Sequence, residues 1–176
     1  GGMYLVCNSN LLYHASVPLN EDGSFKHVNI CGKEYWGKNL LDKIDQLIRT
    51  AYFDEDDEEE KRFAMDYIWY LWCGPDAPSF DKDKMATFER YFIAGKSLHK
   101  ETKGYYYALR NKEEICDRIL EEFGVTGQHT HIINGHVPVK VRKGESPIKG
   151  GGKLIVIDGG FSRAYQATSG IAGYTL

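Results

Sequence analysis

Apolar residues recur at helical spacing in several stretches of the chain. The first spans residues 36–52 and places apolar side chains three or four positions apart: Leu40, Leu41, Ile44, Leu47, Ile48 and Ala51. One buried stripe of this kind predicts a helix. A second helix is predicted over 61–72, ending before Gly74-Pro75, and a shorter one within 83–92. A further helix is expected after Asn111, which stands three residues before Glu114 in a capping-box arrangement, with its end at Gly124.

Short apolar runs between turn residues predict strands. Residues 4–14 favour one or two strands broken at 8–10, and a return strand is expected over 25–30, after the Asp-Gly turn at 22–23. Residues 131–134 and 153–158 are typical of buried strands, and the glycines at 150–152 mark the turn between them. Helices that alternate with such strands predict an α/β fold.

Length and composition narrow the class of protein. With 176 residues, 42% hydrophobic and 27% charged, the chain is expected to form one domain with a core of its own. A net charge of −3 gives no reason to expect a nucleic-acid partner, and no apolar run is long enough for a membrane span. The four cysteines are far apart and form no CxxC pair, which favours reduced thiols in a cytoplasmic protein. Residues 1–2 read as a cloning remnant.

An acidic run occupies residues 54–60, where all seven side chains are Asp or Glu. Such a run invites a metal-binding interpretation. A solvated linker or helix start is favoured instead, because like charges repel one another and acidic residues stabilise the first turn of a helix.

Three polar residues stand at or near the ends of predicted strands: His14, His136 and Asp158. Ends of strands are where α/β folds assemble their sites. Neutral imidazole is a common ligand of transition metals, and the glycine before His136 allows close approach to a ligand. Taken alone, a structural role for His136 in binding neighbouring backbone is the stronger interpretation. Two histidines do not complete a metal site by themselves.

Basic residues and glycines are concentrated between residues 140 and 163. The candidates for binding a phosphate group are Lys140, Arg142, Lys143, Lys149 and Arg163. Lysine and arginine stabilise phosphate charge, and glycine exposes backbone N–H groups. A solvated hairpin explains the same pattern equally well, so both interpretations stay open. No catalytic acid or base can be assigned from the sequence.

Several stretches resemble the class III fructose-1,6-bisphosphatases of bacteria (Firmicutes type), a branch of the calcineurin-like metallophosphoesterases. They are HIINGHVPVK at 131–140, KGESP at 143–147, LIVIDGGFSRAYQ at 154–166, LYH at 12–14, PLNEDG at 18–23, YLWCGP at 70–75 and KMATFERYF at 84–92. The resemblance spans essentially the whole chain.

This resemblance implies a β-sandwich flanked by helices, with two divalent metal ions, expected to be Mn²⁺, at the strand ends. It implies hydrolysis of the 1-phosphate of fructose 1,6-bisphosphate by a metal-activated hydroxide, giving fructose 6-phosphate for gluconeogenesis. His14 and His136 match the two late histidine ligands of the superfamily pattern.

The chain also departs from that pattern. The earlier superfamily motifs, Asp-x-His, Gly-Asp-x-x-Asp and Gly-Asn-His-Asp/Glu, do not occur in it. We therefore expect residues 1–176 to be the C-terminal part of a larger phosphatase domain, inactive alone and prone to self-association through exposed apolar faces. A phosphoprotein phosphatase on the same scaffold and a non-catalytic phosphate-binding domain are the alternatives.

Overall fold

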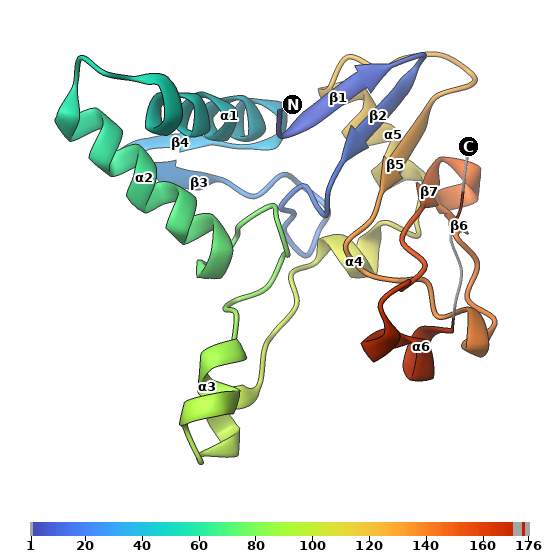
Figure 1. Cartoon of the computed structure of the whole chain (residues 1–176). Helices are drawn as coiled ribbons and strands as arrows, with labels where there is room; N and C mark the ends of the chain where they lie inside the picture. The colour runs from blue at the N-terminus through green and yellow to red at the C-terminus, as the bar shows by residue number, and fades with distance from the viewer. Residues whose placement is uncertain (1, 171–173, 175–176) are drawn as a thin grey trace. The chain divides into compact units, whose positions relative to one another are not determined.

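The computed structural model in Figure 1 describes residues 2–170 and 174, except the side chains of Phe88, Ala164, Tyr165 and Thr168. Contacts divide the chain into two compact units. Unit 1 comprises residues 1–16 and 108–176, and unit 2 comprises residues 17–107. The prediction that the whole chain is part of one larger phosphatase domain concerns a longer protein and stays a prediction.

Unit 1 is built on a five-stranded sheet with strand order β1-β2-β5-β7-β6. Strands β1 (Tyr4–Cys7) and β2 (Asn10–Tyr13) form an antiparallel hairpin. Its turn residues Asn8 and Ser9 have φ values of 49° and 62°, the left-handed conformation that two-residue hairpin turns require. The predicted break at 8–10 is therefore a tight hairpin turn.

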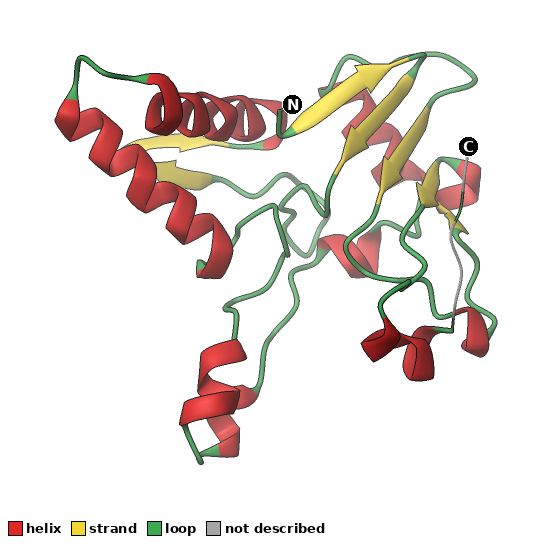
Figure 2. Ribbon diagram, in the orientation of Figure 1, coloured by secondary structure: helices red, strands yellow, loops and turns green. Residues whose placement is uncertain are grey.

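Three neighbouring strands of this sheet run parallel: β2, β5 (His131–Asn134) and β7 (Leu154–Val156). Both β5 and β7 are apolar and largely buried, as expected of parallel strands. Strand β6 (Ile148–Lys149) pairs antiparallel with β7. Strand β7 is shorter than the predicted 153–158. The carboxyl ends of β2, β5 and β7 therefore lie at one edge of the sheet, as Figure 2 shows.

Helix α5 (Glu113–Glu122) packs on the sheet of unit 1 with an apolar face of Ile115, Cys116, Ile119 and Leu120. The predicted capping box at Asn111 is wrong, because the N-cap position is Lys112 and has no side-chain cap. The N–H of Lys112 donates to the carbonyl of Leu109, so a turn after α4 (Tyr106–Leu109) sets the start of the helix. The remaining elements are η2 (Val141–Lys143), η3 (Gly150–Gly152) and α6 (Arg163–Ser169).

Unit 2 combines a small sheet with two long helices. The predicted strand at 25–30 begins later, as β3 (Val28–Ile30), and pairs with β4 (Lys33–Tyr35). Helices α1 (Gly37–Phe53) and α2 (Glu58–Cys73) pack against each other, and their buried residues include Leu40, Leu41, Ile44, Leu47, Ala64 and Leu71. Asp57 caps α2 by accepting from the N–H groups of Glu59 and Glu60, so the acidic run is a helix start, as predicted.

Unit 2 also contains a long loop region with two short helices, α3 (Thr87–Phe92) and η1 (Lys96–His99). Its two connecting segments are tied together by backbone hydrogen bonds from Asp83 to Thr102 and from Gly104 to Asp81, and by an ion pair of Lys82 with Glu101 at 2.8 Å. Throughout the part of the chain described, no helix is long and apolar enough to cross a membrane.

Candidate metal centre

The two candidate histidine ligands lie at the carboxyl edge of the sheet in unit 1. His14 directly follows the last residue of β2, and His136 comes two residues after the last residue of β5. These strands are parallel neighbours, with Leu12 opposite Ile133. The pairing therefore brings together two side chains that are 122 positions apart in the sequence.

The two imidazole rings face each other through nitrogen atoms. Nε2 of His14 lies 3.0 Å from Nδ1 of His136, and the ring centroids are 4.9 Å apart with the planes at 72°. Below the rings, the N–H of Gly135 donates to the carbonyl of His14 at 3.0 Å. His14 is exposed and His136 half-buried, so the nitrogen pair is accessible to a ligand from solvent.

His136 adopts a backbone conformation that is rare for a residue with a side chain. Its φ is 67°, and the N–H of Val137 donates to the carbonyl of Gly135 at 2.8 Å, which closes a three-residue turn around His136. A turn of this kind with a positive central φ is strained. Strained backbone of this sort is concentrated at functional sites, where the surrounding structure holds it. The turn directs the imidazole of His136 toward His14.

The residue before this turn, Asn134, was not singled out by the sequence analysis. Its side chain is 1% exposed, and its Nδ2 donates to the carbonyl of Ala15 at 3.0 Å. The sequence did contain a signal for this residue, because Asn134 is the polar last residue of an apolar strand and directly precedes Gly-His. Asn134 thus links the strand that precedes His136 to the segment that follows His14.

The nitrogen pair fits a metal ion of the first transition row. Two nitrogen ligands about 2.1 Å from one ion and at right angles to each other lie about 3.0 Å apart. The observed separation matches this value, and it equally fits an N–H···N hydrogen bond between the two rings. Within residues 2–170 and 174, no group of three or more His, Cys, Asp or Glu side chains is arranged to hold a metal ion.

Asp158, the third residue predicted at a strand end, lies two residues beyond β7. Its Oδ1 accepts from the N–H of Gly160 at 3.0 Å, and its carbonyl accepts from the N–H of Val139 at 2.9 Å. A methyl group added to Gly135 would lie 3.6 Å from Cβ of Asp158. Asp158 therefore packs beside the turn that carries His136, with its carboxylate engaged in a local turn.

The five basic candidates fall into two groups. Lys149 pairs with Glu145 at 2.7 Å, and Nη1 of Arg142 donates to the carbonyl of Ala167 at 3.1 Å. These two cations therefore stabilise the loops of unit 1. The side chains of Lys140, Lys143 and Arg163 are exposed. Phosphate binding by the five residues stays a prediction.

Glu145 is the anion that organises this basic segment. It accepts from Nζ of Lys149 and from the backbone N–H of Lys140. Burial raises the pKa of its carboxyl, but these hydrogen bonds outweigh burial and hold the pKa below its ordinary value. Glu145 therefore remains charged at neutral pH.

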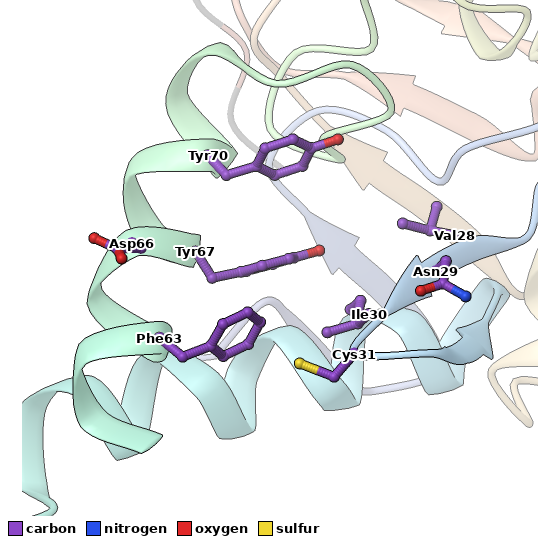
Figure 3. A pocket seen from close by; sticks show the side chains of 8 residues that line it. All are labelled: Val28, Asn29, Ile30, Cys31, Phe63, Asp66, Tyr67 and Tyr70. Atoms are coloured by element: carbon purple, nitrogen blue, oxygen red, sulfur yellow. The ribbon is translucent and has the colours of Figure 1, made fainter. Parts of the chain in front are cut away.

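A separate hollow of about 360 Å³ lies in unit 2, between α2 and β3 (Figure 3). Phe63, Tyr67 and Tyr70 extend from α2 toward the strand, where Val28 and Ile30 form the opposite wall. Burial raises the pKa of Tyr67 to about 12, with a smaller contribution from the neighbouring Tyr70. The hollow is therefore mainly aromatic and aliphatic, unlike the nitrogen pair of unit 1.

Comparison with known proteins places the chain in a family. The family described as Firmicute fructose-1,6-bisphosphatase matches residues 1–176. The chain belongs to this family. The resemblance recognised from the sequence motifs is thereby confirmed.

Similar proteins are named fructose-1,6-bisphosphatase class 3. The chain is 94% identical to that of Bacteroides fragilis, 76% identical to that of Bacteroides thetaiotaomicron and 66% identical to that of Phocaeicola vulgatus. Each match covers 100% of this chain and 26% of the relative, so the chain spans about a quarter of the length of these proteins. No solved structure matches the chain.

Proposed function

We propose that residues 1–176 belong to an enzyme that hydrolyses fructose 1,6-bisphosphate to fructose 6-phosphate and phosphate, a step of gluconeogenesis. Family membership supports this proposal, and so do the names of relatives up to 94% identical. The observation that carries it is the pair of imidazole nitrogens, Nε2 of His14 and Nδ1 of His136, 3.0 Å apart at the carboxyl edge of parallel strands.

His14 and His136 are the residues of this chain that would hold a metal ion, and we propose Mn²⁺ at a centre of two ions. Such ions activate water and stabilise the charge that develops on phosphate oxygens. The five-stranded sheet with its flanking helix would form part of a metallophosphoesterase-like sandwich. The histidines would serve as neutral ligands, with their lone pairs directed toward one point.

The exposed cations of the basic segment, Lys140, Lys143 and Arg163, are proposed to attract the phosphate groups of the substrate. Lys149 and Arg142 would contribute mainly by holding the loops, because each already binds an oxygen of this chain. We also propose a cytoplasmic location, which agrees with four free cysteines, three of them exposed.

We propose further that these 176 residues alone have no normal activity. Two neutral histidines rarely hold two divalent ions without carboxylates to balance the charge. The remaining ligands and the acid that protonates the leaving group would come from the rest of the longer protein.

The proposal is tested on the longer protein with two substrates. Phosphate release is measured from fructose 1,6-bisphosphate and from a phosphopeptide, each with and without Mn²⁺. We expect manganese-dependent release from the sugar bisphosphate. Release from the phosphopeptide alone would favour a phosphoprotein phosphatase, and release from neither would favour a non-catalytic binding domain.

The role of His136 is tested by metal analysis of the longer protein. We expect His136→Ala to lower the amount of bound manganese. His129→Ala is the matched control, because His129 is an exposed histidine just before β5. An unchanged metal content in His136→Ala would remove this residue from the proposed centre.

A further inference from the structure

We propose that Asn134 is a positioning residue, which holds the backbone of residues 14–15 so that Nε2 of His14 faces Nδ1 of His136. This inference rests on the proposed function only for its metal-binding consequence. The geometric part concerns two rings that are in contact without any ligand.

The backbone ladder between β2 and β5 ends before the histidines. The last paired residues are Leu12 and Ile133. Beyond them, the last residue of β5 and the residue after it bind two successive carbonyls of the other segment. The N–H of Gly135 donates to His14, and Nδ2 of Asn134 donates to Ala15, each at 3.0 Å. The side chain of Asn134 therefore continues the ladder past the last backbone pair.

Two successive peptide units with fixed carbonyls define the backbone conformation of the residue between them. The carbonyls of His14 and Ala15 belong to the two peptide units that meet at Cα of Ala15, so neither unit can rotate without breaking a hydrogen bond. His14 is exposed, and its ring contacts that of His136. The two hydrogen bonds therefore restrain the backbone from which the His14 side chain extends.

The hydrogen bond from Nδ2 of Asn134 to the carbonyl of Ala15 is buried, so loss of this donor has a clear structural consequence. Ala15 and Asn134 are each 1% exposed, so water cannot readily replace the amide of Asn134. Without that donor, the carbonyl of Ala15 must turn toward another partner. That turn changes the backbone dihedral angles at Ala15, and this change displaces His14, which is joined directly to Ala15.

Thr130 offers a matched comparison at the opposite end of β5. It is 3% exposed, and its Oγ1 donates to the carbonyl of Gly127 at 3.3 Å. Thr130→Val removes one buried bond from a side chain to a backbone carbonyl, as Asn134→Ala does. A general loss of stability is thus shared by the two variants, whereas displacement of His14 is specific to Asn134.

The test uses nuclear magnetic resonance on the 176-residue chain. In the metal-free wild type, we expect a nuclear Overhauser effect between the ring protons of His14 and His136. It should disappear in Asn134→Ala and persist in Thr130→Val. With Mn²⁺ added, paramagnetic broadening of both ring signals should require a 10- to 100-fold higher metal concentration in Asn134→Ala, the range typical of residues that orient metal ligands.

The outcomes separate this inference from the proposed function. Loss of the ring contact in Asn134→Ala without broadening of the wild type by Mn²⁺ supports positioning and counts against the metal centre. A preserved ring contact and unchanged broadening overturn positioning. Asn134→Asp, which keeps the shape but has no N–H donor at neutral pH, replaces Asn134→Ala if the latter does not fold. If neither folds, the role of Asn134 is merely structural and the inference fails.

Discussion

Asp81 in unit 2 is a buried carboxyl whose charge costs stability at neutral pH. The residue is 4% exposed, and its carboxyl accepts from the backbone N–H of Tyr106. Its Oδ2 has no hydrogen-bond partner among the described residues. The pKa of Asp81 is raised from 3.8 to about 6, mainly by burial and to a lesser degree by the nearby Asp76, while the Tyr106 hydrogen bond and Lys26 oppose the rise. Asp81→Asn removes this charge and keeps the shape.

The magnitude follows from the pKa values. One pKa unit corresponds to about 1.4 kcal/mol, so the rise of Asp81 to about 6 makes its charged form roughly 3 kcal/mol less favourable in the folded state. The new amide places N–H groups where Oδ2 of Asp81 has no hydrogen-bond partner among the described residues, and burying such groups unpaired costs about 1–3 kcal/mol. The difference between these two contributions gives an expected rise in the free energy of unfolding of Asp81→Asn at pH 7 of about 0 to 2 kcal/mol.

The stability difference between Asp81→Asn and the wild type should change with pH in one direction. Between the unfolded pKa of 3.8 and the folded pKa of about 6, the folded state binds more protons at Asp81 than the unfolded state. The wild type therefore loses stability at this site as the pH rises through that window, and the loss is complete above it. The advantage of Asp81→Asn should be present at pH 7 and disappear as the pH falls to 4.

Urea denaturation at intervals from pH 4 to pH 8, followed by tryptophan fluorescence, measures this difference. Asp83→Asn is the control, because the hydrogen bond from the backbone N–H of Thr102 lowers the pKa of this exposed carboxyl. That variant should lose stability at pH 7 and regain it toward low pH. A pH-independent difference between Asp81→Asn and the wild type would refute the reasoning.

Three further predictions concern packing, metal binding and association. Gly150→Ala should lose about 1–3 kcal/mol more free energy of unfolding than the control Gly124→Ala in urea denaturation. Both glycines have positive φ, but only at Gly150 would the methyl carbon lie 2.5 Å from Sγ of Cys116. Equal losses would show that backbone strain alone decides. Calorimetry of this chain with Mn²⁺ should show no tight binding of two ions, and stoichiometric uptake of two would contradict the view that its ligand set is incomplete. Light scattering should detect self-association that weakens in Trp69→Ser, since Trp69 is 65% exposed on α2; a wild type that stays monomeric at every concentration would contradict this.

The sequence by itself determined the elements that depend on local interactions. The apolar stripe of 36–52 became α1, and the acidic run became the start of α2, because spacing and capping act within a few residues. The hairpin of β1 and β2 was likewise marked by its turn residues. The start of α5 was misplaced, since a turn between Leu109 and Lys112 set it in place of a cap by Asn111.

The sequence also identified the two candidate ligands, but it did not predict that they lie next to each other. His14 and His136 each follow a predicted strand, yet only the parallel pairing of β2 with β5 places their nitrogens 3.0 Å apart. Tertiary structure likewise decided that Arg142 binds the carbonyl of Ala167 and that Asn134 binds the carbonyl of Ala15. Strand pairing depends on contacts between distant residues, and local patterns carry no information about which strands meet.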